Sequence, residues 1–340
     1  MLFPALLCAC SFAEAQENPR QPKETIRVGV DRVNVGVIVT DSRGHFVDGL
    51  RREDFRLFDD GAEQPLTGFA AIEEPAQVLL LIEAGPAVYL LESGHVQAAI
   101  ALLDGLSRED HVAVVRYADA PTVLLDFTTD QQAVFAAFGQ LRFNLGFGSL
   151  NLSTSVSTVL DWIASAQGKK TIVLLSTGVD TSPSNEEAAL MRKLKVSDVR
   201  LLAISLTGGL DNPQPSKNRK KPPVAIENKA AQQFEEAGRF LRQLAEATGG
   251  RAYFPANTSE FNSVYSEIAQ LVRHEYSLAF APPALDGQVH SIKVQVVAPQ
   301  TQMPNGQSAA YRIDHRQAYL AARRQVVGLT SRQNLRGQRR

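Results

Sequence analysis

The residue types that most often carry catalysis are dispersed along this 340-residue sequence. No two histidines have the His-x-x-x-His spacing that lets one face of a helix hold a metal ion. A Gly-x-Ser-x-Gly turn, which would expose a nucleophilic serine, is absent from the sequence. Each histidine is therefore interpreted as a surface or hydrogen-bonded residue: His45, His95, His111, His274, His290 and His315.

Two glycine-containing stretches resemble nucleotide-binding motifs but lack their geometry. Gly168-Lys169-Lys170-Thr171 has the end of a phosphate-binding loop, but it lacks the earlier glycine and precedes a predicted strand instead of following one. Gly146-Phe147-Gly148 lacks the third glycine of a dinucleotide-binding turn and follows no predicted strand. These motifs do not support an enzyme, and we expect a non-enzymatic protein.

The charge balance argues against a general attraction to nucleic acid. The formal net charge is −1, so the chain as a whole creates no strong positive field. Basic residues gather in two segments without aromatic side chains, Lys217–Lys221 and Arg332–Arg340. Because grooves that bind single-stranded nucleic acid combine cations with aromatic stacking platforms, both segments are interpreted as solvated chain. We expect no nucleic-acid partner.

The first fifteen residues have the composition of a signal peptide. Met1 to Phe12 is nearly all apolar or small, and Ala13-Glu14-Ala15 fits the small-x-small pattern before a cleavage site. Both cysteines, Cys8 and Cys10, lie in this segment, so cleavage after Ala15 would leave a chain without cysteine. We expect an exported, periplasmic or extracellular protein with no transmembrane span in the mature chain. Leu7-Cys8-Ala9-Cys10 also resembles a lipobox, so a lipid anchor on Cys10 is the alternative.

From residue 77 onward, short apolar runs alternate with segments of helical periodicity. The runs are typical of strands buried on both faces and cover 78–82, 112–115, 122–127, 171–175, 201–206 and 253–254. The predicted helices cover 93–106, 129–141, 156–163, 185–197, 229–248 and 259–272. This alternation predicts an α/β fold with a doubly wound, mostly parallel, Rossmann-like sheet over residues 77–272.

On both sides of this region, apolar residues alternate with a period of two, which is typical of half-buried strands. The pattern occurs at Val33–Val39 and near Phe55 before it, and at 276–280, 292–296 and 311–313 after it. We predict that segments 27–74 and 273–318 pair as the two halves of a small β-sandwich, with the α/β domain inserted between them. Residues 16–26 are interpreted as a linker, and residues 319–340 as a disordered basic tail.

In such sheets, ligands bind outside the carboxyl ends of the strands, so the loops after Ile82, Leu141 and Leu175 are the first places to seek a site. Residues 78–87 and 171–181 resemble the corresponding strands and loops of the von Willebrand factor type A domain family, and 146–150 occupies the place of its Gly-Thr loop. The layout further resembles a bacterial branch best known from Acidobacteria. That likeness depends on 39–55 before the domain and Tyr276–Pro283 after it.

The resemblance implies a site where one Mg²⁺ is surrounded by an Asp-x-Ser-x-Ser loop, a threonine and a second aspartate. Glu83 stands at the first aspartate, and both loop serines are replaced, by Gly85 and Ala87. Ser149 takes the place of the threonine, and Thr177 replaces the second aspartate. We therefore expect no metal cofactor. The alternative is an atypical Mg²⁺ site with Glu83, Ser149 and Thr177 as partial ligands, which the nearby Asp180 and Glu92 would have to supplement.

The predicted function is an exported protein-binding module of the adhesion type that acts without metal. Its candidate contact surface consists of the loops at the former metal site: Glu83, Gly85, Ala87, Tyr89, Phe147, Ser149, Thr177 and Asp180. The apolar loop residues either contact a protein partner or fold inward and fill the place of the ion. The alternatives are a Mg²⁺-dependent adhesion domain and a structural component of the cell envelope. An exported hydrolase with Glu83 as general base would need a second polar group beside Glu83, and the sequence does not reveal one.

Overall fold

The computed structural model describes residues 32–70, 75–85, 101–141, 148–207, 225–297 and 311–323. The predicted signal peptide, the linker, the segment 208–224 and most of the basic tail lie outside the described residues. Within the described part, no helix has the length and apolar character that crossing a membrane requires.

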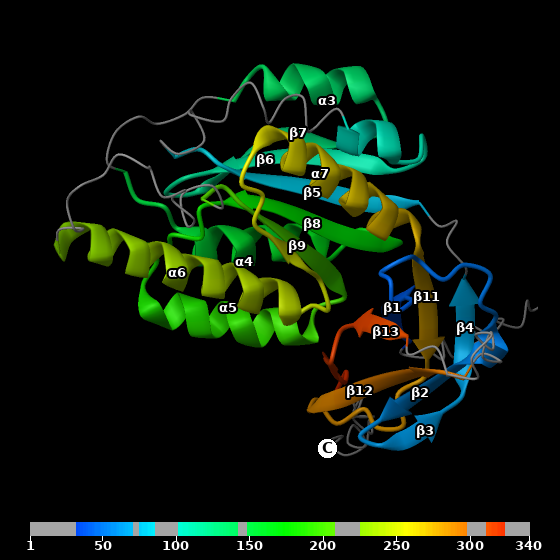
Figure 1. The fold of residues 1–340 in the computed structure, drawn as a ribbon. Helices are drawn as coiled ribbons and strands as arrows, with labels where there is room; N and C mark the ends of the chain where they lie inside the picture. Colours follow the sequence, from blue (N-terminus) through cyan, green and yellow to red (C-terminus); the bar gives the residue numbers. More distant parts are fainter. Residues whose placement is uncertain are drawn as a thin grey trace, which may run out of the picture. The chain divides into compact units, whose positions relative to one another are not determined.

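A six-stranded sheet has the strand order β10-β9-β8-β5-β6-β7 (Figure 1). Its strands are β5 (Ala76–Glu83), β6 (His111–Tyr117), β7 (Pro121–Thr128), β8 (Lys169–Ser176), β9 (Val199–Ser205) and β10 (Ala252–Tyr253). All neighbours run parallel except β6 and β7, which are antiparallel. Every residue of β8 is buried, as expected of a central parallel strand. The prediction of a mostly parallel sheet is confirmed.

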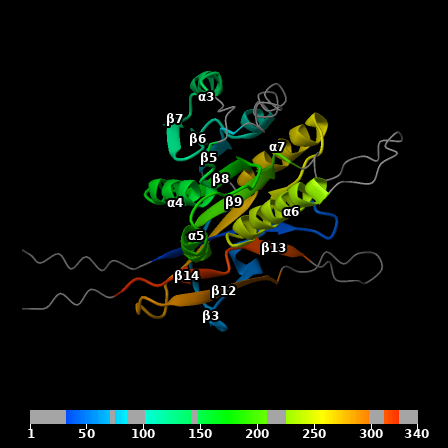
Figure 2. The same cartoon turned by 90° about the vertical axis from the view of Figure 1, so that its left-hand side faces the viewer.

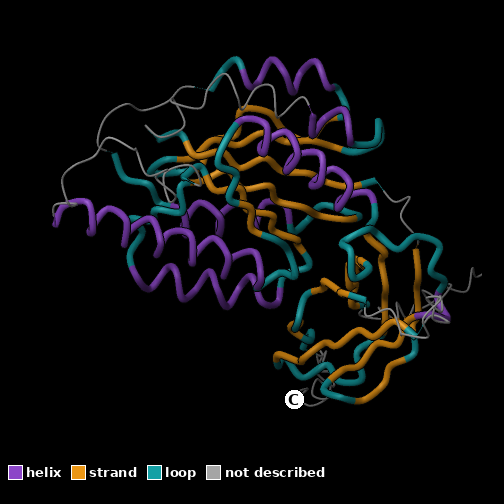
Figure 3. The backbone as a smooth tube through the Cα atoms, in the orientation of Figure 1, coloured by secondary structure: helices purple, strands orange, loops and turns teal. Residues whose placement is uncertain are grey.

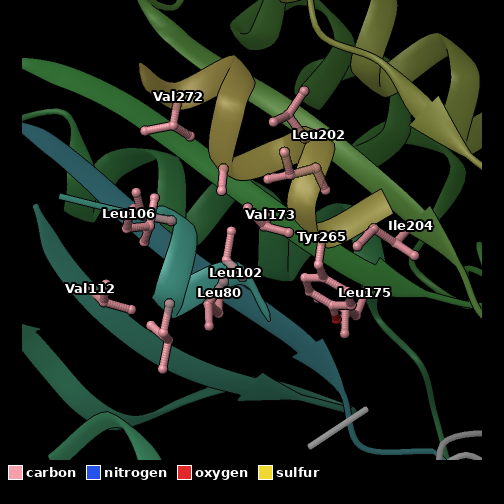
Figure 4. Close-up of a cluster of buried hydrophobic side chains, with 14 of the residues drawn as sticks. Leu80, Leu102, Leu106, Val112, Val173, Leu175, Leu202, Ile204, Tyr265 and Val272 are labelled. Carbon is pink, nitrogen blue, oxygen red and sulfur yellow. The ribbon is translucent and has the colours of Figure 1, made fainter. Parts of the chain in front are cut away.

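Helices cover both faces of this sheet (Figures 1 and 2). They are α3 (Gln131–Phe138), α4 (Leu152–Ile163), α5 (Ser184–Val196), α6 (Ala225–Glu246) and α7 (Thr258–Arg273), and residues 101–105 are also helical. Side chains of α3 and α7 pack on one face, in a cluster that includes Leu80, Val173 and Tyr265 (Figure 4). Side chains of α4, α5 and α6 pack on the other face. The sheet is therefore doubly wound, as predicted.

The helix ends follow the capping signals in the sequence. The Asp130 side chain accepts hydrogen bonds from the first turn of α3, and Asn257 does the same for α7. Beyond the end of α6, Gly249 adopts a φ of +68°, the left-handed conformation that glycine tolerates best. The predicted start of α6 at Lys229 is wrong, because the helix begins at Ala225. A helix can begin soon after a proline pair, and the prediction extended the proline-rich segment too far.

Two four-stranded sheets flank the insertion in sequence, and each takes strands from both chain segments (Figure 1). Their strands are orange at the lower right of Figure 3. The first has the order β13 (Arg312–His315), β1 (Val33–Thr40), β11 (Glu275–Phe280) and β4 (Leu66–Ala70). The second has the order β14 (Ala318–Leu320), β12 (Val289–Val296), β2 (Phe55–Asp59) and β3 (Ala62–Gln64), and a short 3-10 helix, η1 (Arg52–Asp54), precedes β2. One apolar cluster joins them, with members such as Val37, Leu57, Tyr276 and Ile292. The predicted insertion between two halves of a β-sandwich is confirmed.

The end of the sandwich lies further along the chain than the sequence predicted. Residues 319–323 were assigned to a disordered tail, but β14 pairs with β12, and Tyr319 is buried beneath it. Tyr319 and Ala321 alternate toward the core, and the Tyr319 hydroxyl donates a hydrogen bond to Asp59 Oδ2 over 2.8 Å. This strand was missed because three residues give too short a pattern to read. The five-residue strand β4 was missed as well.

Buried arginines connect the insertion to the sandwich. The Arg200 side chain, on β9, is 5% exposed and donates from Nε to Glu275 Oε2 on β11 over 2.7 Å. Its other nitrogens donate to the carbonyl oxygens of Gly36, on β1, and Gly249. Arg251 makes a second connection, with 2.7 Å between Nη2 and Asp314 Oδ2 on β13. These contacts fix the sandwich against the end of the sheet that lies opposite the candidate site.

Candidate functional site

Glu83 is the last residue of β5, at the carboxyl end of a central parallel strand. Because neighbouring parallel strands end at the same edge of a sheet, the residues that close β6 and β8 lie beside it. Tyr117 pairs with Glu83 in the register between β5 and β6. Ser176 ends β8, and Thr177 follows it. We call this part of the molecule the carboxyl edge: the ends of β5, β6 and β8 with the loops that follow.

The carboxylate of Glu83 is a hydrogen-bond acceptor for all three of these neighbours. Thr177 donates to Oε2 from its backbone N–H over 2.8 Å, and its hydroxyl lies 2.9 Å from Oε2 and 3.2 Å from Oε1. The hydroxyls of Ser176 and Tyr117 donate to Oε2 over 3.1 and 3.2 Å. These two hydroxyls also lie 2.7 Å apart. The result is a compact polar network inside the edge of the sheet.

Glu83 has no exposed surface. Burial raises its pKa above the usual value of a glutamate, and the hydrogen bonds from Thr177, Ser176 and Tyr117 oppose that rise. Burial and the nearby Glu83 charge also raise the pKa of Tyr117 well above its usual value. The side chain that the resemblance places at the first metal ligand is thus directed into the protein, away from solvent.

Leu150 occupies the space beside Gly85, where the family has its first serine. A Cβ atom added to Gly85 would lie 3.2 Å from Leu150 Cδ2 and 3.0 Å from Glu83 Oε1. Both distances are shorter than ordinary van der Waals contact. An apolar side chain therefore stands beside Gly85, close to the buried carboxylate.

Restoring the family serine by Gly85→Ser is expected to lower the free energy of unfolding by about 1 kcal/mol, through overpacking. In a Leu150→Ala background the same substitution is expected to cost less, because the space is then open. Urea denaturation of the four variants measures the coupling. Gly139→Ser is the control, since Gly139 has helical φ and a Cβ there would meet nothing closer than 3.4 Å. An equal cost of Gly85→Ser in both backgrounds would contradict the role of Leu150.

The loops of the carboxyl edge are joined by hydrogen bonds between protein groups. Asp180 accepts from Ser182 N over 2.9 Å and from both the backbone and hydroxyl of Ser153, at the start of α4. The Thr181 hydroxyl accepts from Leu150 N over 2.9 Å. Ser149, which precedes Leu150, is exposed. Asp180 is therefore both a turn residue and a link between the loop after β8 and α4.

The structure brings together some of the predicted site residues. Glu83 and Thr177 are in direct contact, with Gly85 beside them, whereas Ser149 and Asp180 lie in neighbouring loops that have other partners or face solvent. Glu92, Ala87, Tyr89 and Phe147 lie outside the described residues.

A Mg²⁺ shell requires several oxygen atoms with lone pairs directed at one point. The Glu83 oxygens receive protein donors, and the Thr177 hydroxyl donates to Glu83 and accepts from Val179 N. Glu83, Ser149 and Thr177 as placed do not fit such a shell.

Two important residues of the edge were missed from the sequence, Tyr117 and Ser176. The sequence did not reveal a second polar group beside Glu83, whereas the structure places Tyr117 and Ser176 there together with the predicted site residue Thr177. The sequence predicted the strands that became β6 and β8, but it did not predict the strand order that places both of them beside β5. A register that aligned the strand ends would have placed Tyr117 and Ser176 on either side of Glu83.

Comparison with known proteins supports the family resemblance. Residues 93–179 match the model of the von Willebrand factor type A domain, and this range contains Tyr117, Ser176 and Thr177. The UPF0353 protein of Mycobacterium marinum is 26% identical over 191 residues, which cover 53% of this chain and 53% of that protein. The chain thus spans about half the length of the curated relatives it matches.

Two solved structures are similar at low scores. An aerotolerance-related membrane protein from Bacteroides fragilis has a TM-score of 0.42 at 13% identity, covering 58% of this chain and 98% of that chain. A von Willebrand factor type A structure from Catenulispora acidiphila has a TM-score of 0.44 at 12% identity, covering 79% and 74% of the two chains. The α/β insertion of this chain thus contains a sequence match to the von Willebrand factor type A domain over residues 93–179, and its doubly wound sheet is the α/β architecture that the resemblance implied.

Proposed function

We propose that this chain is an exported, non-enzymatic protein-binding module that contacts its partner through the carboxyl edge without a metal ion. The observation that carries the proposal is the state of Glu83. Its carboxylate is fully buried and hydrogen-bonded by Thr177, Ser176 and Tyr117, so it is not available to a metal ion or to a substrate. The composition of residues 1–15 supports export, and a lipid anchor on Cys10 is the alternative route to the cell envelope.

Hydrogen bonds at the edge replace the organising role of an ion. Thr177 to Glu83 joins the ends of β8 and β5, and Ser153 to Asp180 joins α4 to the loop after β8. Leu150 N to Thr181 joins the loop before α4 to the same segment. A surface held in one conformation before binding loses less conformational entropy when a partner docks. The edge is therefore suited to recognition without needing a metal to assemble it.

A photo-crosslinking amino acid at Ser149 tests this function on the full chain in its native host cells. Ser149 is exposed at the edge, and Glu63, exposed on β3 of the sandwich, is the matched control position. We expect a discrete protein adduct from Ser149 that is absent from Glu63 and equally strong with millimolar Mg²⁺ or with chelator. An adduct that requires Mg²⁺ would favour the metal-dependent alternative. The same adducts at both positions, or none at Ser149, would contradict binding through the carboxyl edge.

A further inference from the structure

A second cluster of polar side chains lies in the sandwich, where β2 ends beside the start of β12 (Figure 1). Asp59 ends β2, Asp60 follows it in the turn, and His290 is the second residue of β12. One potential ligand atom from each lies within 4.8 Å of the other two. His290 Nδ1 lies 3.4 Å from Asp59 Oδ1 and 2.9 Å from Asp60 Oδ2. None of these residues takes part in the carboxyl edge.

Within this cluster, the buried carboxylate of Asp59 has an unusual environment. It is 3% exposed, yet its Oδ1 accepts no hydrogen bond from any residue that the structure describes. Its other oxygen, Oδ2, accepts from the Tyr319 hydroxyl over 2.8 Å, which fixes the carboxylate with Oδ1 toward the cluster. A buried carboxylate oxygen without a donor is costly. His290 Nδ1, 3.4 Å away, is the basic atom facing it.

Hydrogen bonds also orient the side chains of Asp60 and His290. Asp60 Oδ1 accepts from the backbone and the hydroxyl of Ser291, each over 2.8 Å, while Oδ2 lies 2.9 Å from His290 Nδ1. His290 Nε2 lies 3.2 Å from Asp286 Oδ1, and the imidazole stacks on the ring of Tyr319. When Nε2 carries the proton and donates to Asp286, Nδ1 directs a lone pair between the two aspartates.

We propose that Asp59 Oδ1, Asp60 Oδ2 and His290 Nδ1 bind a divalent transition-metal ion, for which Zn²⁺ is the best-fitting probe. One imidazole nitrogen with two carboxylate oxygens is a ligand set that such ions accept. Zinc–ligand bonds of about 2.0–2.2 Å in a tetrahedral shell separate neighbouring ligands by about 3.3 Å. The distances of 2.9 and 3.4 Å from Nδ1 lie on either side of that value.

The hydrogen bonds that orient the three potential ligands also match those found around bound metal ions. A ligating histidine usually donates its second ring N–H to a carboxylate, as His290 does to Asp286. Tyr319 and Ser291 orient the two aspartates. The Asp60 side chain is 57% exposed, so water can complete the coordination shell. A bound ion would join β2 to β12 and thereby stabilise the sandwich.

Zn²⁺ titration of the metal-stripped full chain, followed by calorimetry and thermal melting, tests the site. We expect one equivalent to bind and Tm to rise by mass action. Asp60→Asn retains a residue that tolerates the φ of +47° and an acceptor for Ser291, yet should weaken binding at least about 10-fold. His290→Gln should do the same. His45→Gln, at an exposed histidine beside Asp41, is the matched control and should leave affinity unchanged.

Replacement of zinc by Co²⁺ adds a readout that does not depend on stability, because ligation by His290 and the aspartates gives visible absorption bands that Asp60→Asn removes. Zinc binding of equal strength in Asp60→Asn, His290→Gln and the unchanged chain would mean an adventitious ion only and would overturn the proposal. So would the absence of binding to the unchanged chain, which would leave His290 as a cation paired with the aspartates. Neither result affects the carboxyl edge, since Glu83 and its partners lie in a different domain.

Discussion

Replacing Glu275 by alanine is expected to lower the free energy of unfolding by about 3–5 kcal/mol, the usual cost of removing one partner from a buried ion pair. Glu275 Oε2 accepts from Arg200 Nε over 2.7 Å, and the Arg200 side chain is 5% exposed. Among the described residues, the hydrogen-bond partners of the guanidinium without Glu275 are the carbonyl oxygens of Gly36 and Gly249. Both are neutral, so the positive charge loses the carboxylate that is paired with it inside the junction.

Equilibrium urea denaturation measures this effect, and two further variants establish its cause. Glu63→Ala breaks the exposed pair between Glu63 and Arg56 and should cost less than about 1 kcal/mol. Arg200→Met combined with Glu275→Met removes both charges and should recover much of the loss, because buried ion pairs often contribute little over apolar residues of similar volume. If Glu275→Ala were no more harmful than Glu63→Ala, the pair would not stabilise the junction.

The fold could be predicted from the sequence wherever several residues repeat one pattern. Val78–Ile82 and Thr171–Leu175 are continuous apolar runs, and only a strand covered on both faces can bury such a run. The helices that alternate with the strands supply the two covering layers. The insertion between sandwich halves followed from matching alternation at Val33–Val39 and Tyr276–Phe280, which the structure pairs directly as β1 and β11.

Short elements and single contacts could not be predicted in this way. The three residues of β14 are held by pairing with β12 and by the burial of Tyr319, both of which depend on segments distant in sequence. The same applies to the Asp59, Asp60 and His290 cluster. His290 is about 230 residues from Asp59 and Asp60 along the chain, and it meets them because β2 pairs with β12. The sequence presented His290 as one of six scattered histidines.

The candidate site could be predicted from the sequence in part. The position of Glu83 at the carboxyl edge followed from the strand pattern, and the losses of ligand groups followed from the resemblance. The direction of the Glu83 side chain could not be predicted from the strand pattern or from the resemblance. Glutamate is one methylene longer than aspartate, and the structure shows that its carboxylate lies among Tyr117, Ser176 and Thr177 instead of facing the loops. Leu150 fills the adjacent space, a contact that depends on how the loop before α4 folds back.

The second large effect is expected at Glu83 itself. Glu83→Ala removes the acceptor for the Thr177 backbone N–H and for three hydroxyls, all of which are buried. Buried donors left without partners, together with the void, should lower the free energy of unfolding by about 3 kcal/mol. Glu83→Gln keeps the shape and one acceptor oxygen, so at neutral pH it should cost far less. Urea denaturation of the two variants distinguishes a structural carboxylate from one that serves only for recognition.

The pH dependence of Glu83→Gln gives a sharper test than its stability at one pH. Burial raises the pKa of folded Glu83 above the unfolded value of about 4.5, so the folded chain binds this proton more tightly. That contribution to stability is present at low pH and is lost as the pH rises from about 4.5 through the folded pKa. Glutamine does not titrate, so the variant should gain on the unchanged chain over this window. Parallel stability profiles would show that the Glu83 carboxylate is not desolvated, and would thereby return it to the set of groups available to a metal ion.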